Sequence, residues 1–369
     1  MTQPLRIGII GGGANSAIGL SHLAAIRMDG KYQIGPCVFS HLEDENRQSH
    51  EVYGLPWIGH PISLAAWLDQ NKSEIDIAAL LTPSTEHAAH IVEIASRGMS
   101  FITEKPIACS LDQAKMIKAA LAKEKGLKAR FVHNYSGYPM FREMILRLKQ
   151  GRIGNVHHVR VEMPSDGFAR ESITGKPQKW RQSDPEVPMI MLDLGTHMHH
   201  LVRMAVGKSK ARVSARMDTL VNSLGVVDNV EIWEERADGI RVSYWMSKAH
   251  LGVKNGLQIE VYGQDGALIW HQIDPDHLIE VDTNSNRSII NRGAIQSAAS
   301  RHDRFKAGHP TGFVEAFACF YSDLAEDIWA ARDGSAGSRW VCPIEDAFDG
   351  LEFLEAAARS HKTGSWIDV

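Results

Sequence analysis

Two short stretches of this sequence combine side chains that could act on a proton or a charge. Lys105 ends a short apolar run in "SFITEKP". Asp193, His197 and His200 recur at i, i+4 and i+7 in "MIMLDLGTHMHH", so a helix would carry them on one face, with His199 pointing elsewhere. A lysine can offset negative charge on a substrate oxygen, and a histidine can accept a proton near neutral pH.

The helical group admits three interpretations. Asp193, His197 and His200 could bind a metal ion, or Asp193 could orient and charge a proton-accepting His197, or the group could be a purely structural polar face. The H-E-x-x-H order is absent and no further ligand cluster is evident, which favours acid/base chemistry. For Lys105 the alternative is a solvated lysine at a strand end.

The N-terminal segment "IGIIGGGANSAIG" indicates the element that would position a ligand. A β-branched run, 5–10, ends in glycines and is followed by a helical pattern. Gly11 and Gly13 match the first two glycines of G-x-G-x-x-G, Ser16 occupies the third place, and Gly19 comes three residues later. The segment predicts a dinucleotide loop, in which helix N-terminal amides hold a pyrophosphate, and a glycine-rich turn without a ligand is the alternative.

The pattern of elements changes near residue 134. Before it, short apolar runs alternate with helical patterns, which predicts a doubly wound parallel sheet of the Rossmann type over 1–134. After it, alternating runs are joined by turns such as Asp238-Gly239 and Asp265-Gly266, which predicts an α+β domain with a large, mostly antiparallel sheet over 135–369. We expect helices over 189–206, 313–332 and 344–361 to cover one face of that sheet.

The other face of the second sheet needs a partner. Its predicted strands carry Trp233, Tyr244 and Trp245, and an open face with such side chains usually packs on another subunit. The sequence therefore predicts a homodimer or homotetramer, with the second domain serving substrate binding and oligomerisation.

Composition excludes several classes of protein. The chain has 369 residues, 44% hydrophobic and 23% charged, and a formal net charge of -4, which offers no basic field for nucleic acid or anionic lipid. No apolar run approaches membrane-spanning length and no signal peptide is evident, so we expect a soluble cytoplasmic protein. The four scattered cysteines form no C-x-x-C pair and fit reduced thiols; they are Cys37, Cys109, Cys319 and Cys342.

Five motifs together resemble the Gfo/Idh/MocA family of sugar and inositol dehydrogenases. They are the glycine loop, "TPSTEH" at 82–87, "EKP" at 104–106, "WR" at 180–181 and D-x-x-x-H at 193–197. The resemblance implies an NAD(P)-dependent oxidoreductase that moves a hydride between a nicotinamide cofactor and a secondary alcohol of a sugar, inositol or nucleotide sugar.

The resemblance also implies roles for individual residues. Lys105, Asp193 and His197 become the catalytic group. The implied cofactor-binding residues are Gly11, Gly13, Ala14, Asn15, Ser16, Ser40, Thr82, Pro83, Ser84, His87, Glu104, Lys105, Asn134, Trp180 and Arg181. The implied substrate-binding residues are Lys105, Tyr135, Asp193, His197, His200 and His309. No metal site is expected.

Three departures from the family pattern bear on cofactor and substrate. The glycine loop is longer, His200 stands where many relatives carry aspartate, and Ser40 occupies the place of the acidic residue after the second strand. We predict NAD as the cofactor, with NADP as the alternative. Two other functions remain: a non-catalytic nucleotide sensor, and a metal-dependent hydrolase using Asp193, His197 and His200.

Overall fold

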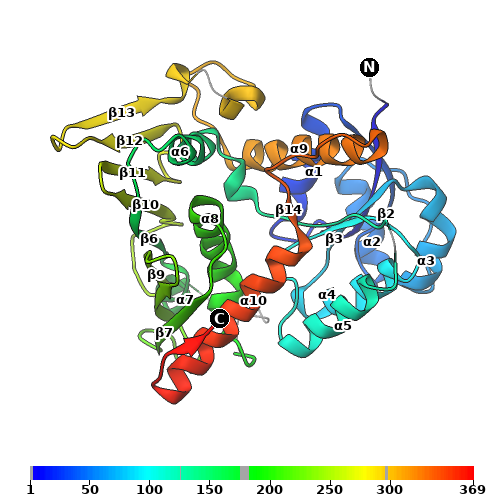
Figure 1. Cartoon of the computed structure of the whole chain (residues 1–369). Coiled ribbons are helices and arrows are strands. Elements are labelled where there is room, and N and C mark those ends of the chain that lie inside the picture. The colour runs from blue at the N-terminus through cyan, green and yellow to red at the C-terminus, as the bar shows by residue number, and fades with distance from the viewer. Residues whose placement is uncertain (1–2, 125, 175–182, 296–297) are drawn as a thin grey trace. The chain divides into compact units, whose positions relative to one another are not determined.

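The structure is a computed structural model that describes residues 3–124, 126–174, 183–295 and 298–369 (Figure 1). The chain forms two compact units. Unit 1 comprises Met1–Gly137 and Gly312–Phe348, and unit 2 comprises Tyr138–Thr311 and Asp349–Val369. The first change of unit falls three residues after the boundary expected at 134, whereas 312–348 returns to unit 1 rather than staying with the C-terminal domain.

Unit 1 contains the predicted doubly wound sheet. The strands found in its described residues follow the order β14-β5-β4-β3-β1-β2, and all neighbours are parallel except β14 with β5. Their bounds are β1 Leu5–Gly11, β2 Tyr32–Val38, β3 Ile77–Leu81, β4 Phe101–Thr103, β5 Ala129–Phe131 and β14 Cys342–Pro343. Because the parallel strands run the same way, their carboxyl ends meet at one edge of the sheet.

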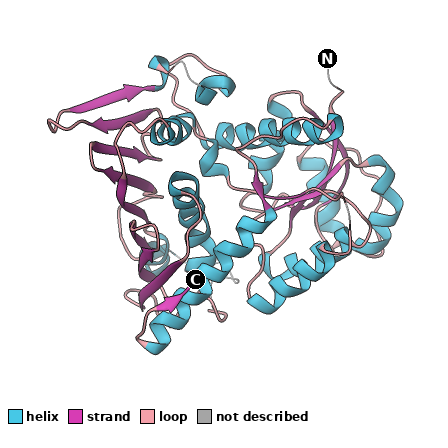
Figure 2. Cartoon of the chain, in the orientation of Figure 1, coloured by secondary structure: helices cyan, strands magenta, loops and turns pink. Residues whose placement is uncertain are grey.

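Helices cover both faces of this sheet (Figures 1 and 2). Helices α1 and α9 pack on the face that presents Leu5, Ile7 and Ile9, and α4 and α5 lie on the opposite side. The helices of unit 1 are α1 Gly19–Met28, α2 Glu43–Val52, α3 Leu64–Asn71, α4 His87–Ala95, α5 Leu111–Leu121 and α9 Phe313–Asp333, with the short turns η1 Lys72–Glu74, η2 Ser84–Glu86 and η3 Asn134–Gly137.

Helix α9 corrects one expectation. It lies where the sequence predicts a helix, but it packs in unit 1 against α1 and η3 instead of covering the second sheet. Phe317, Tyr321 and Leu324 join the core formed by β1 and β3. Periodicity predicts the apolar face of a helix but does not specify which sheet buries that face.

Unit 2 contains the predicted large sheet. Its described strands follow the order β13-β12-β11-β10-β6-β9-β8-β7-β15, and every pair is antiparallel except β6 with β9. Their bounds are β6 Val156–Pro164, β7 Ala211–Asp218, β8 Asn229–Arg236, β9 Arg241–Ser247, β10 Gln258–Gly263, β11 Gly266–His271, β12 His277–Val281, β13 Arg287–Asn291 and β15 Ile367–Asp368. Strands β12 and β13 were not predicted.

One face of this sheet is covered by helices (Figure 1). Helices α6 and α8 and the second part of α10 pack there, so the expected coverage by 189–206 and 344–361 is confirmed. The helices and turns are α6 Pro139–Lys149, α7 Gly167–Thr174, η5 Met191–Gly195, α8 Thr196–Val206, η6 Arg292–Ala294, η7 Ala298–His302 and α10 Ile344–Thr363, whose first residues belong to unit 1. Every helix in the described residues is too short or too polar to cross a lipid bilayer.

The three aromatic residues expected on the open face do not share it. Tyr244 is buried, packs on Phe353 of α10 and donates its hydroxyl to Glu234. Trp233 pairs across the strands with Ser243, in the alternate position, and is 46% exposed. The placement of Tyr244 on an open face is therefore wrong, because side chains alternate between the faces of a strand.

Candidate active site

The predicted cofactor-binding residues of unit 1 follow adjacent strands. Gly11 ends β1, Thr82 follows β3, Glu104 follows β4, and Asn134 begins η3 three residues after β5. Register joins these ends, since Gly11 pairs with Leu81 and Thr103 pairs with Phe131. The structure thus brings these residues to the carboxyl edge of the sheet, where open α/β sheets bind ligands.

The glycines of the loop have separate structural roles. Gly11 has a φ of +79°, and a Cβ there would lie 2.6 Å from the backbone nitrogen of Thr82. A Cβ at Gly19 would lie 1.9 Å from the carbonyl oxygen of Gly12. Gly19 therefore allows α1 to start directly against the loop, which is the close packing that the third glycine of the fingerprint provides. The sequence spacing alone does not reveal that Gly19 takes the role of the third glycine.

The loop has the features of a dinucleotide cradle. The Ser16 hydroxyl accepts the backbone N–H groups of Ile18 and Gly19 at 3.3 and 3.2 Å, so it defines the start of α1. Gly13, Ala14, Ser16 and the exposed Asn15 line the turn before that helix. The amide nitrogen of Asn134 is buried and lacks a hydrogen-bond partner within the described chain. A bare backbone loop at a helix start suits a pyrophosphate, and an unused amide donor suits a carboxamide oxygen, so these residues fit NAD.

Glu104 is held in a buried network that the sequence does not predict. His22 of α1 places Nε2 2.9 Å from Oε1 of Glu104 and Nδ1 2.7 Å from the hydroxyl of Tyr321 in α9. The other carboxylate oxygen of Glu104 accepts the backbone N–H of Lys105 at 3.0 Å. Burial and the charge of Glu104 raise the pKa of Tyr321 above its ordinary value. The network fixes the main chain that carries the half-buried Lys105.

His87 ties two strand ends together. Its Nδ1 lies 2.6 Å from the carbonyl oxygen of Pro106 and its Nε2 lies 2.9 Å from that of Thr82. Both partners only accept hydrogen bonds, so the neutral ring donates to one of them. Burial lowers the pKa of His87, which favours the neutral ring. Cofactor contact by His87 stays a prediction.

Other predicted residues occupy varied positions in unit 1. Pro83 is exposed and Ser84, at the start of η2, is half-buried. Tyr135 is buried in η3, with its ring centroid 6.2 Å from that of Phe313. Trp180 and Arg181 lie outside the described residues.

The stretch that carries Asp193 is not a regular α-helix. Met191–Gly195 forms a π-helical turn, η5, and α8 begins at Thr196. A π-helical turn contains an extra residue, so the step from Asp193 to His197 passes from π-helical to α-helical geometry, and the sharing of one face by these two side chains stays a prediction. Such turns are frequent at functional sites, and here the change of register falls inside the D-x-x-x-H motif.

Asp193 forms a buried ion pair that sequence reasoning missed. The Nζ atom of Lys248 lies 2.6 Å from Oδ2 of Asp193, and both side chains are more than nine-tenths buried. Lys248 directly follows β9, and its ammonium also lies 5.8 Å from the ring centroid of Phe168. The only local signal is a lysine after the alternating strand "RVSYWMS", which carries no motif. A pairing across 55 residues is set by the fold.

The histidines of α8 have different environments. His197 and His200 are buried, and burial together with the nearby His197 and His199 lowers the pKa of His200 to about 3. The ring of His199 packs against Phe353, and His199 was expected to point away from the other two histidines. Burial lowers the pKa of His199 to about 4. His199 and His200 are therefore uncharged at neutral pH.

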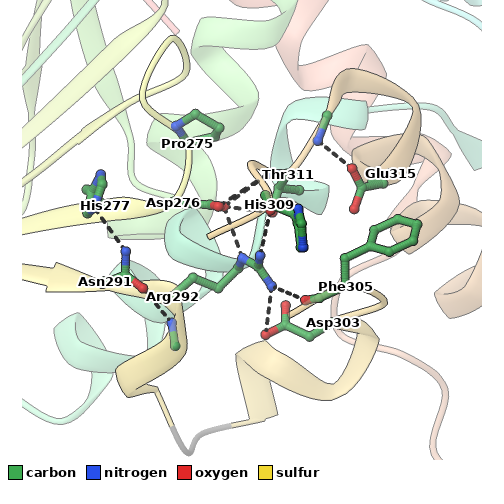
Figure 3. Close-up of polar contacts among 12 residues, drawn as sticks. Pro275, Asp276, His277, Asn291, Arg292, Asp303, Phe305, His309, Thr311 and Glu315 are labelled. Atoms are coloured by element: carbon green, nitrogen blue, oxygen red, sulfur yellow. Dashed lines mark hydrogen bonds and ion pairs between the residues drawn. The ribbon is translucent and has the colours of Figure 1, made fainter. Parts of the chain in front are cut away.

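His309 lies on a loop that a buried arginine secures (Figure 3). The guanidinium of Arg292 donates to Asp276 at 3.1 Å and to the carbonyl oxygens of Phe305 and His309 at 3.0 and 2.9 Å. Thr311 donates its hydroxyl to the same Asp276 at 2.7 Å. The exposed His309 side chain thus extends from a fixed backbone, and its contact with substrate stays a prediction.

The structure therefore assembles two sets of predicted residues, one in each unit. Unit 1 holds the glycine loop, Glu104, Lys105 and Asn134, and unit 2 holds Asp193, His197 and His200 with the added Lys248. In the described part of the chain, no group of three or more His, Cys, Asp or Glu residues could hold a metal ion.

Comparison with known families agrees with this division. Residues 5–132 match the family described as "Oxidoreductase family, NAD-binding Rossmann fold", and residues 141–269 match the "GFO/IDH/MocA C-terminal domain". The chain belongs to the Gfo/Idh/MocA oxidoreductase family. The predicted family and fold class are thus confirmed, and this Gfo/Idh/MocA protein is an oxidoreductase with an NAD-binding Rossmann domain.

Individual relatives extend over the full length of this Gfo/Idh/MocA chain. The uncharacterized oxidoreductase YfiI of Bacillus subtilis is 26% identical, covering 100% of this chain and 98% of the relative. An oxidoreductase structure from Sinorhizobium meliloti is 29% identical with a TM-score of 0.85, covering 99% and 100% of the two chains. An inositol dehydrogenase homologue from Azotobacter vinelandii, solved with NAD+, is 22% identical with a TM-score of 0.92, covering 100% and 98%.

Proposed function

We propose that this oxidoreductase transfers a hydride between NAD and a secondary alcohol of a sugar or a polyol such as an inositol. The observation that carries the proposal is the carboxyl edge of the unit 1 sheet, where a glycine loop suited to a pyrophosphate follows β1 and Lys105 follows β4, with β3 between the two strands. The inositol dehydrogenase homologue with bound NAD+ supports the substrate class.

The proposed chemistry divides between two residues. His197 accepts the hydroxyl proton at a ring nitrogen while the carbinol carbon loses its hydride, leaving a carbonyl group. The Lys105 ammonium offsets the negative charge that develops on the oxygen. When bound, NAD supplies the hydride acceptor. The two residues belong to different units, and their joint role rests on the motifs that carry them.

Asp193 acts in this proposal as a positioning residue together with Lys248. In this proposal Asp193 stabilises the protonated ring of His197, and Lys248, whose Nζ lies 2.6 Å from Oδ2 of Asp193, compensates the buried carboxylate. Lys248 also restricts the orientation of Asp193. Acid/base work by His197 is thereby supported over a metal face, since the carboxylate already binds a cation.

A substrate screen tests the function. Purified protein with NAD+ is offered a panel of sugars, inositols and nucleotide sugars, and NADH formation is followed by absorbance. We expect one class to give turnover that is lost in His197→Ala and in Lys105→Ala. NADH binding without turnover on any class would favour the sensor alternative, and failure to bind NADH would reject the proposal.

We further propose a homodimer or homotetramer in the cytoplasm. Trp233, 46% exposed on the open face of the unit 2 sheet, supports an intersubunit surface. The four cysteines are free and buried, which suits a reducing compartment. Light scattering tests the assembly, and a particle of 40.9 kDa alone would contradict it.

A further inference from the structure

The end of β2 lacks the carboxylate that dinucleotide-binding sheets usually place there. In such sheets an acidic residue about 20 residues after the glycine loop binds the ribose 2'-hydroxyl of NAD. In this chain β2 ends at Val38 and is followed by Phe39 and Ser40. The strand itself therefore offers only a neutral hydroxyl.

Helix α2 places a carboxylate beside this strand end. Glu45 lies in the first turn of α2, and its Oε2 atom accepts a hydrogen bond from the Ser40 hydroxyl at 2.8 Å. The same hydroxyl oxygen accepts the backbone N–H of Leu42 at 3.1 Å. The Ser40 proton is thus directed at Glu45, and the carboxylate is held beside the end of β2. Glu45 is exposed and Ser40 is half-buried, so a ligand can reach both.

Glu45 also lies on the face of α2 that contacts the glycine loop. Ser49, four residues later on the same face, accepts the backbone N–H of Ala14 at 3.0 Å and donates to the carbonyl oxygen of Glu45 at 2.7 Å. A Cβ added at Gly13 would lie 2.7 Å from the Ser49 hydroxyl. The carboxylate of Glu45 and the loop are therefore parts of one surface.

The arginine nearest in sequence to Ser40 and Glu45 is paired with other groups. Arg47 donates to Glu43 at 2.9 Å, one turn back on the helix, and its guanidinium lies 5.3 Å from the ring centroid of Trp57. The first turn of α2 carries Glu43, Asp44 and Glu45, so its side chains present net negative charge. This arrangement opposes an additional phosphate.

We propose that Glu45 is the residue that selects NAD(H) over NADP(H) in this protein. Its carboxylate, steadied by Ser40, accepts the ribose 2'-hydroxyl and repels a 2'-phosphate at the same place. The inference rests on the proposed nicotinamide-dependent function, and it assigns to a helix the role usually carried by the strand end.

Nucleotide binding without substrate tests the proposal. Dissociation constants for NADH and NADPH are measured by fluorescence titration on the full chain, on Glu45→Gln and on Glu51→Gln, an exposed acid on the same helix. We expect the unaltered protein to prefer NADH, Glu45→Gln to reduce the preference by about tenfold, and Glu51→Gln to leave it unchanged.

The outcomes separate this inference from the function itself. An unchanged preference in Glu45→Gln, or an unaltered protein that prefers NADPH, overturns the role of Glu45 while leaving the dehydrogenase proposal intact. Binding of neither nucleotide by the unaltered protein overturns both. A further variant, Glu45→Arg, should reverse the preference, and thermal melting of each variant checks that the fold is retained.

Discussion

In unit 1 the candidate binding groups are mostly main-chain amides, whereas in unit 2 the candidate groups are buried ionisable side chains. The loop around Gly11 and Gly19 works through close backbone packing and a helix start. The segment of unit 2 formed by η5 and α8 instead buries Asp193, His197 and His200, and Lys248 is paired with the Asp193 carboxylate.

The two sites should therefore differ in how ligand binding and chemistry depend on pH. Main-chain amides keep their N–H donors at every pH, so ligand binding by the glycine loop depends on the shape of the loop. Buried titratable groups depend on their partners and on pH, because each charge must be compensated or neutralised. Glu104 and Lys105 are the exceptions in unit 1, the first as a buried carboxylate and the second as a half-buried cation at the strand-end edge.

The largest effect is expected from Lys105→Ala. Turnover should fall at least as much as in His197→Ala, by about 10² or more, because the alkoxide would form without its cation. NADH affinity, measured separately by fluorescence titration, should change far less, since the loop is untouched. Lys123→Ala, an exposed lysine after α5, serves as the control. Equal losses of turnover and NADH affinity would show that Lys105 serves cofactor binding instead.

His197→Ala should lower turnover by about 10² to 10⁴ while NADH affinity stays nearly intact. Oxidation by the unaltered enzyme should rise with pH, because the base must be unprotonated to accept the hydroxyl proton. The measurement is kcat against pH for both proteins, with His157→Ala, exposed on β6, as the control. Near-normal turnover with an unchanged pH profile would show that another residue is the base, and Tyr135 would be the first candidate.

Lys248→Met should leave the Asp193 carboxylate buried without its cation. We expect the free energy of unfolding to fall by about 3–5 kcal/mol, and kcat to fall more than KM changes. Lys254→Met, an exposed lysine on the following loop, should have little effect. The double variant Lys248→Met/Asp193→Asn should recover much of the stability, as denaturant unfolding can measure. Additive losses would contradict the coupling.

The smallest effect concerns His200 and acid stability. Its pKa is lowered from 6.5 to about 3 in the folded chain, so between these values the unfolded chain binds more protons. Stability therefore falls as pH drops below 6.5, and this histidine contributes to the slope throughout the range down to its folded-state pKa. His200→Asn should remove that share of the slope in urea unfolding. His41→Gln, exposed in unit 1, should not, and an unchanged slope in His200→Asn would contradict the assignment.

Local pattern determined much of the fold and part of the site. The strand-turn-helix order around Gly11 predicts a ligand loop, because glycines, β-branched runs and helix starts are properties of neighbouring residues. The position of Lys105 follows from the same local logic, since it lies two residues after β4 of a parallel sheet. The hairpins of unit 2 were likewise predicted from turns such as Asp238-Gly239 between β8 and β9.

Only the tertiary structure decided the partners that tune these residues. Lys248 meets Asp193 because β9 ends beside a π-helical turn, and Glu45 meets Ser40 because α2 packs on the glycine loop. Helix α9 contributes Tyr321 to unit 1, although it follows the second sheet in the chain. These contacts depend on which apolar faces bury one another, and burial is set by the whole chain. The sequence specifies which side chains are available. The packing of the whole chain decides which partners they meet, and those partners determine their charge.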